Sequence, residues 1–103
     1  MAENFLKTIK EAILKIDPDA HIILYGSRAR NNHKIDSDWD FLILLNEKPD
    51  IQKTEAIRDV IYDIELDSGE IITTIIRDVK EWNSTLYKAT SFYKNVTKDA
   101  INI

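Results

Sequence analysis

The first half of the chain contains two kinds of hydrophobic pattern: side chains spaced as in a helix, and short continuous runs. Hydrophobic side chains recur every three or four residues over 3–16, which predicts an amphipathic helix that ends before Pro18. Short, largely hydrophobic runs over 21–25 and 38–45 predict two buried strands. Between these two strands, the pattern predicts one helical turn over 27–31, followed by a polar loop.

The second half of the chain shows the same two patterns, helical spacing and short hydrophobic runs. Residues 56–66 repeat hydrophobic side chains at helical spacing, and the β-branched run over 71–76 predicts a third strand. Two short helices are predicted over 79–87 and 91–101. The order helix, strand, strand, helix, strand, helix, helix predicts an α/β (α+β) fold: a small mixed sheet of three to four strands flanked by helices. We expect one domain over residues 1–103.

Composition narrows the class of protein. The 103 residues are 44% hydrophobic and 31% charged, which is ordinary for a globular domain, and the absence of cysteine excludes disulfides and thiolate metal sites. A formal net charge of −4 argues against binding to duplex nucleic acid. No secretory signal is visible and no hydrophobic run approaches the ~20 residues of a membrane helix, so we expect a cytoplasmic protein that does not bind membranes.

Two carboxylates open the second predicted strand. Because side chains at i and i+2 of a strand share a face, Asp38 and Asp40 are expected on one side of the sheet. Converging carboxylates of this kind bind hard cations such as Mg²⁺. The alternative is a solvent-exposed strand end with Trp39 packed inward, and for an isolated Asp-x-Asp that reading is favoured.

A strand that ends in Gly-Ser indicates a possible phosphate site. Gly26 lets the backbone approach an anion closely, and the Ser27 hydroxyl can donate a hydrogen bond to it. The guanidinium of Arg28 or Arg30 can bind phosphate oxygens in bidentate fashion. Alone, Gly-Ser is as well explained by an ordinary turn in which Ser27 caps the following helical turn.

The combination is more specific than either half. Gly26-Ser27, ten intervening residues and then Asp38-Trp39-Asp40 resemble the signature of the DNA polymerase β-like nucleotidyltransferase superfamily. The longer pattern, with Arg28, Ala29, Arg30 and Ser37, resembles its minimal nucleotidyltransferase branch. The resemblance implies the polymerase β-like palm fold.

The resemblance also implies roles for individual residues. Asp38 and Asp40 would be the catalytic residues and would hold two Mg²⁺ ions. The nucleotide-binding residues would be Gly26, Ser27, Arg28, Arg30 and Ser37. The implied reaction transfers a nucleoside monophosphate, AMP for the expected substrate ATP, to a hydroxyl of a protein or small molecule.

One part of the family pattern is missing. Such proteins usually carry a third carboxylate on a later strand, and the strand expected over 71–76 contains no acid. Thr73 or Thr74 occupies the family position, and a neutral hydroxyl is a poor metal ligand and a poor base. Glu70, water or a partner chain could supply the third ligand.

The missing carboxylate keeps other functions open. The resemblance includes antitoxin-like proteins that pair with HEPN-family partners, so a regulatory subunit or a nucleotide-binding module with weak or no catalysis is the alternative function. A chain of this length has no room for a separate acceptor-binding lobe. We therefore expect a homo-oligomer or a hetero-oligomer.

Four further residues near the motifs allow more than one reading. Tyr25 and Trp39 can stack on a base or pack in the core, and His33 can contact substrate or lie solvated in the loop. Asn31 stands where relatives often carry glycine, and asparagine tolerates a left-handed backbone.

Overall fold

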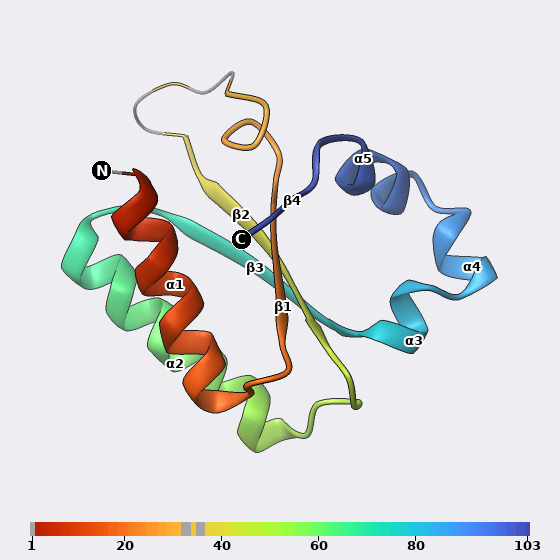
Figure 1. The fold of residues 1–103 in the computed structure, drawn as a ribbon, viewed down its shortest axis with the longest axis horizontal. Coiled ribbons are helices and arrows are strands. Elements are labelled where there is room, and N and C mark those ends of the chain that lie inside the picture. The colour runs from red at the N-terminus through yellow and green to blue at the C-terminus, as the bar shows by residue number, and fades with distance from the viewer. Residues whose placement is uncertain (1, 32–33, 35–36) are drawn as a thin grey trace.

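A four-stranded mixed sheet forms the centre of the molecule in the computed structural model, which describes residues 2–31, 34 and 37–103. The strands lie in the order β3-β2-β1-β4 (Figure 1). Their bounds are His21–Tyr25 for β1, Trp39–Leu45 for β2, Ile72–Asp78 for β3 and Ile101–Asn102 for β4. β1 pairs antiparallel with both β2 and β4, whereas β2 and β3 are parallel.

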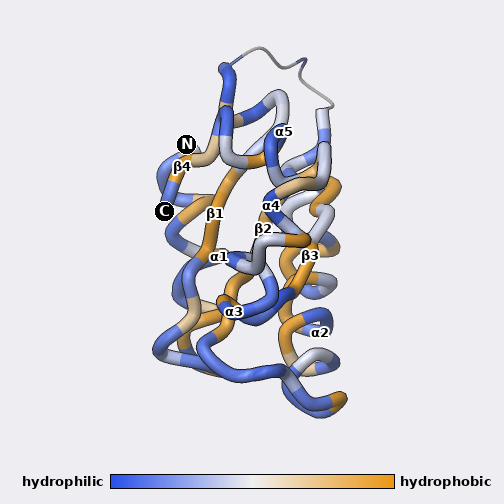
Figure 2. The backbone as a smooth tube through the Cα atoms, turned by 90° about the vertical axis from the view of Figure 1, so that its right-hand side faces the viewer, coloured by the Kyte–Doolittle hydropathy of each residue, from blue (hydrophilic) through white to orange (hydrophobic). Residues whose placement is uncertain are grey.

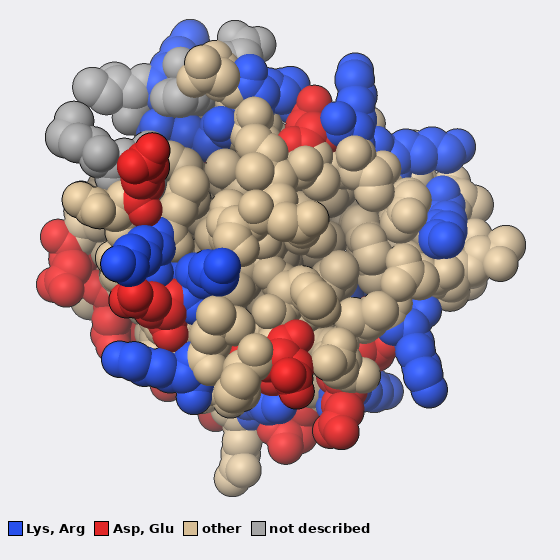
Figure 3. All heavy atoms as spheres, in the orientation of Figure 1, with Lys and Arg blue, Asp and Glu red and all other residues tan. Residues whose placement is uncertain are grey.

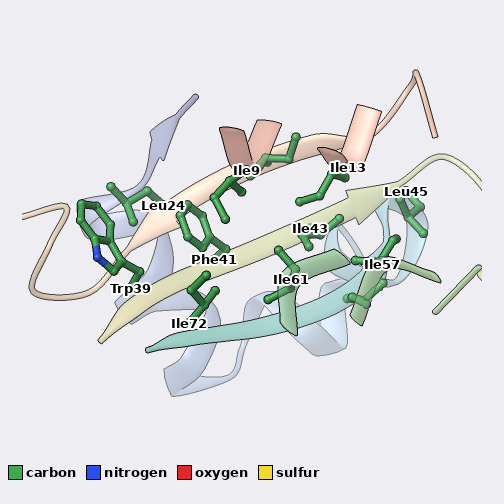
Figure 4. Packing of buried hydrophobic residues seen from close by; sticks show 12 residues of the cluster. Ile9, Ile13, Leu24, Trp39, Phe41, Ile43, Leu45, Ile57, Ile61 and Ile72 are labelled. Carbon is green, nitrogen blue, oxygen red and sulfur yellow. The ribbon is translucent and has the colours of Figure 1, made fainter. Parts of the chain in front are cut away.

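Two long helices pack on one face of this sheet. α1 (Ala2–Ile16) and α2 (Ile51–Ser68) lie side by side in Figure 1. The spacing of four between Ile9 and Ile13 brings both side chains to the same face of α1, where both are fully buried. Ile57 and Ile61 repeat this arrangement on α2, and all four contact the hydrophobic side of the strands (Figure 4).

Three short helices cover the opposite face. They are α3 (Val79–Trp82), α4 (Thr85–Lys88) and α5 (Ser91–Asp99), and they bury a second, smaller cluster against Leu42 and Leu44. Figure 2 shows the strands as the most hydrophobic part of the chain, lying between more hydrophilic helices. β2 is buried on both faces because helices cover both sides of the sheet, and this explains its continuous hydrophobic run.

The predicted helices and strands are largely confirmed, although several bounds differ; α2 begins at Ile51, for example, and β3 continues to Asp78. The helix expected over 79–87 is two helices, because the Ser84 hydroxyl accepts a hydrogen bond from the Tyr87 amide and starts α4. The last helix ends at Asp99 instead of residue 101. The helical turn expected over 27–31 is a hydrogen-bonded turn in which the amides of Ala29 and Arg30 donate to the Gly26 carbonyl.

Residues 101–102 form a fourth strand, β4, that the pattern of hydrophobic residues in the sequence does not reveal. Ile101 and Asn102 pair with Leu24 and Ile23 of β1. A two-residue strand is too short to show a period, so only the structure could identify it. In the described part of the chain, no helix is both long and apolar enough to cross a membrane.

Candidate functional site

Alternation along β2 places Asp40 and Trp39 on opposite faces of the sheet. Trp39, Phe41 and Ile43 pack toward α1 and α2, whereas Leu42 and Leu44 pack toward α3–α5. Asp40 therefore faces the side of the three short helices, at the open end of the strand, and is half-buried. Asp38 precedes the first residue of β2 and is exposed.

Gly26 brings the two halves of the sequence motif together. Tyr25, the last residue of β1, pairs with Asp40 in the antiparallel ladder, and Gly26 follows it with a φ of 77°. A Cβ on Gly26 would lie 2.5 Å from Asp40 Oδ2, closer than any real side chain tolerates. The position thus needs glycine for its left-handed backbone and also for the carboxylate that lies against it.

The charges around Asp40 favour a cation. Partial burial and the negative charge of Asp38 raise the pKa of Asp40 above its ordinary value, and the positive charge of Arg30 opposes this rise. A divalent ion bound between the carboxylates would remove the repulsion between them. Two carboxylates whose negative charges are only partly offset by Arg30 fit Mg²⁺, which prefers oxygen ligands.

Within the described residues, no group of three acidic or histidine side chains is close enough to hold one metal ion. In the parallel ladder Thr73 is the direct partner of Asp40, so the two side chains share a face. Thr74 pairs with Phe41 and is directed to the other face. Of the two threonines, Thr73 is therefore the one that stands beside the carboxylates.

Glu70 is held elsewhere and does not complete the acidic pair. One of its carboxylate oxygens accepts a hydrogen bond of 3.1 Å from the Trp39 indole and lies 3.6 Å from the Arg28 guanidinium. Since the Trp39 side chain is on the face opposite Asp40, this arrangement speaks against Glu70 as a third metal ligand. Water or another chain remains as the source.

Arg28 connects the motif loop to the core. Its Nε and Nη2 atoms donate to the Ser37 carbonyl at 3.2 and 3.0 Å, and its guanidinium lies 4.4 Å from the centre of the Trp39 ring. Only 9% of the side chain is exposed. These contacts hold the two ends of the loop together just before Asp38. Arg28 thus positions the carboxylates, and its donors already have partners inside the protein.

Arg30 is better placed than Arg28 to meet a ligand. Its side chain is 45% exposed, it donates to Asp99 of α5 at 2.9 Å, and its charge acts on Asp40. Ser27 is half-exposed at the start of the turn. The Ser37 hydroxyl accepts a hydrogen bond from the Lys34 amide, which shapes the loop before Asp38.

The structure decides between the alternative readings for Trp39 and Asn31. Trp39 is 7% exposed and packs on Phe5 at 4.8 Å, so it is a core residue. Asn31 has a φ of 56°, which confirms the left-handed turn. Burial and the Asp40 charge raise the pKa of Tyr25 to about 12, so its hydroxyl stays protonated at neutral pH. His33 lies outside the described residues.

A pocket beside Gly26 adds residues that the sequence motifs do not contain. It has a volume of about 410 Å³ and is lined by Tyr25, Gly26 and Arg30 together with α5 residues that include Phe92 and Asn95. The sequence signal for these α5 residues is weak, because helical spacing of aromatic and polar residues is usual in amphipathic helices. Only the packing of α5 beside the Gly26 turn identifies them.

The sequence of nearly the whole chain matches a known family. Residues 6–101 match the family described as Nucleotidyltransferase domain. The chain belongs to this family. This match confirms the resemblance to polymerase β-like nucleotidyltransferases seen in the sequence. No curated protein matches the chain.

Two solved structures are similar to this nucleotidyltransferase domain. One, from Sulfolobus solfataricus, carries the provisional name of nucleotidyltransferase; it gives a TM-score of 0.55 over 98% of this chain and 83% of its own, at 17% identity. A second structure with the same provisional name gives a TM-score of 0.48 at 28% identity, over 75% of this chain and 82% of its own. The first confirms the α+β fold with its mixed sheet.

Proposed function

We propose that this domain transfers a nucleoside monophosphate, AMP from ATP, to a hydroxyl of a protein or small molecule. The observation that carries the proposal is the contact between Gly26 and Asp40. It places the turn that would receive the triphosphate directly against a carboxylate that would bind its cation. Family membership supports the general class of reaction.

In this proposal the site residues have three roles: binding the metal ions, binding the phosphates and fixing the loop before Asp38. Asp38 and Asp40 would hold two Mg²⁺ ions, which when bound neutralise the phosphates and stabilise the leaving pyrophosphate. The Gly26-Ser27 turn would bind the β- and γ-phosphates, and Arg30 would contact a phosphate oxygen. Arg28 and Ser37 would act from inside the protein, by fixing the loop that presents Asp38.

The proposed transfer has a simple balance of bonds. The acceptor oxygen forms a bond to the α-phosphorus while the bond from that phosphorus to the bridging oxygen of pyrophosphate breaks. The hydroxyl proton passes to water, because Thr73 offers no base at the position beside Asp40. Transfer by the chain alone should therefore be slow.

The direct test uses ATP labelled at the α-phosphate, Mg²⁺ and a lysate of the source organism. Wild-type protein should transfer label to a discrete acceptor, and the Asp38→Ala/Asp40→Ala variant should not. Equal labelling by both proteins would contradict the roles assigned to the carboxylates. Absence of labelling with both would contradict transfer.

Thr73 also favours a second candidate function. A site with two carboxylates and a neutral third position can bind Mg²⁺ and ATP without efficient chemistry, as a regulatory subunit would. In this case the domain would act in an antitoxin-like manner on a HEPN-family partner. Metal-dependent ATP binding without label transfer, with recovery of such a partner in a pull-down, would favour this function over the first.

An oligomer is part of either proposal. The described surface has large exposed hydrophobic side chains along α2 and before the edge strand β3, namely Tyr62, Leu66 and Ile71. Contacts with a second chain would cover them and would supply acceptor binding. We predict at least a dimer or a hetero-complex by light scattering. A monomer at high concentration, with no partner in a pull-down, would contradict this prediction.

A further inference from the structure

The pocket beside Gly26 lies between the motif turn and the last helix. Its volume of about 410 Å³ falls within the range of small-molecule sites. Tyr25 and Gly26 form its wall on the β1 side, and α5 forms the facing wall. Tyr25 pairs with Asp40 on the sheet and Gly26 lies against its carboxylate, so the pocket adjoins Asp40.

One face of α5 provides the wall opposite the motif turn. Phe92, Asn95, Val96 and Asp99 follow the spacing i, i+3, i+4, i+7, which brings their side chains to the same side of the helix. The helix is fixed in place: Val96 is 1% exposed, and Phe92 packs edge-to-face on Tyr25 at 5.9 Å. A wall held this firmly presents its polar groups in a defined geometry.

The lining of the pocket combines two kinds of group. It includes the cations Arg30 and Lys98, whose charges suit phosphate oxygens. Figure 3 shows further lysine and arginine side chains around the α4 and α5 region, although the net charge of the chain is −4. The lining also includes an aromatic ring and an exposed amide, those of Phe92 and Asn95. Cations, an aromatic ring and an amide together suit a nucleotide, which carries both phosphate and a base.

Asn95 is the group suited to recognise a base. It is exposed in the pocket, and its side-chain amide makes no hydrogen bond to any other described residue. An amide offers one donor and one acceptor side by side, and this pair complements the N6 and N7 atoms of adenine. Phe92 provides an aromatic surface against which a base can pack.

Asp99 holds the Arg30 side chain beside the pocket. Its carboxylate, 15% exposed, accepts the 2.9 Å hydrogen bond from Arg30. This ion pair joins α5 to the motif turn, and both of its members line the pocket. The last helix is thereby tied to the same turn that faces Asp40.

We propose that this pocket binds the nucleoside of the nucleotide, and that Asn95 confers a preference for adenine. The inference rests on the proposed function, because it requires the triphosphate to bind at Gly26 and the carboxylates. In this inference α5 determines which nucleotide binds, whereas the proposed roles of the motif residues concern only phosphate and metal.

The test compares three probes in the presence of Mg²⁺: ATP, UTP and inorganic tripolyphosphate, with binding measured by calorimetry. Wild-type protein should bind ATP more tightly than UTP and tripolyphosphate. Asn95→Ala should weaken ATP binding about tenfold, the size expected for one bidentate base contact, and should leave tripolyphosphate binding unchanged. Since Asn95 is exposed and alanine favours helices, this variant should fold normally.

Thr97→Ala, an exposed position of α5 that does not line the pocket, is the matched control and should bind all three probes as wild type does. Equal affinity of wild type for ATP and tripolyphosphate, or an Asn95→Ala variant with unchanged ATP binding, would overturn the inference. The proposed function would survive either of these results, provided that tripolyphosphate binding still required Asp38 and Asp40. Tripolyphosphate binding that is indifferent to both carboxylates would overturn the two together.

Discussion

At the scale of single residues, Gly26 is the position where the site depends most on one side chain being absent. Its φ of 77° is costly for other residues, and a Cβ would also meet Asp40 Oδ2. Gly26→Ala should lower the free energy of unfolding by more than the ~1 kcal/mol typical of left-handed strain alone. It should also abolish Mg²⁺-dependent ATP binding, because the carboxylate must move. Urea denaturation and calorimetry measure the two effects.

Gly69 offers a matched control for this substitution. It has a φ of 75°, but an added Cβ would meet nothing within 4 Å. Gly69→Ala should therefore show the backbone strain without the clash, and ATP binding should be unaffected. If both variants lost equal stability and both bound ATP, the contact between Gly26 and Asp40 would have no functional importance.

Asp40 gives a prediction about pH. Its raised pKa means that the folded protein holds this proton more tightly than the unfolded chain, so the free energy of unfolding should fall as the pH rises through that pKa. Asp40→Asn removes the ionisation. Without metal at neutral pH the variant should be more stable than wild type, and the difference should disappear below the ordinary pKa of 3.8.

Thermal unfolding with and without Mg²⁺ checks this prediction. Mg²⁺ should raise the Tm of wild type by binding the folded state, and it should have little effect on Asp40→Asn. Asp63→Asn, at an exposed position of α2, serves as the control and should behave like wild type. A wild type whose Tm ignores both pH and Mg²⁺ would rule out the electrostatic description of the site.

At the scale of elements, the register between β2 and β3 decides what stands beside the carboxylates. Thr73 pairs with Asp40 on the same face, and Thr74 is directed to the other face. Thr73→Asp should supply the missing acid and increase label transfer at least about tenfold, which is less than the roughly 10²- to 10⁴-fold of a well-positioned base. Thr74→Asp is the matched control and should give no increase. Equal rates for both variants and wild type would show that Thr73 does not occupy a catalytic position.

Hydrophobic spacing predicts the elements that pack broadly against the core. α1, β1 and the hydrophobic half of β2 follow it closely, because their side chains are sorted by burial. The break between α3 and α4 depends instead on one capping hydroxyl, that of Ser84, and β4 depends on pairing with β1. Neither one capping hydrogen bond nor the pairing of a two-residue strand leaves a period in the sequence.

In the candidate site, too, some features could be predicted from the sequence and others depend on particular contacts in the fold. Gly26, Asp38 and Asp40 could be predicted from their types and spacing, and their approach in the fold agrees with that prediction. The engagement of Arg28 with Ser37 and Trp39, and of Glu70 with Trp39, could not be predicted, since an arginine or glutamate near a motif has many possible partners. The contribution of α5 depends on packing between residues about 70 apart in sequence, such as Arg30 and Asp99.

At the scale of the whole molecule, the two faces of the sheet differ: one carries the main hydrophobic core and the other carries the candidate site. The face covered by α1 and α2 is a hydrophobic core that fixes the strands (Figure 4), and Arg28 and Glu70 belong to that side through Trp39. The other face carries Asp40, Thr73 and the α5 pocket at its open end. The side of α1 and α2 can therefore hold the carboxylates in place, while Asp40, Thr73 and the pocket lie together on the other side.

Binding of ATP measured by titration calorimetry, with and without Mg²⁺, tests the central claim most directly. We predict that wild-type protein binds ATP at millimolar or lower concentrations only when Mg²⁺ is present, and that Asp38→Ala/Asp40→Ala abolishes this binding while remaining folded. No Mg²⁺-dependent ATP binding by the wild type at millimolar concentrations, or undiminished binding by the double variant, would contradict the assignment of this site.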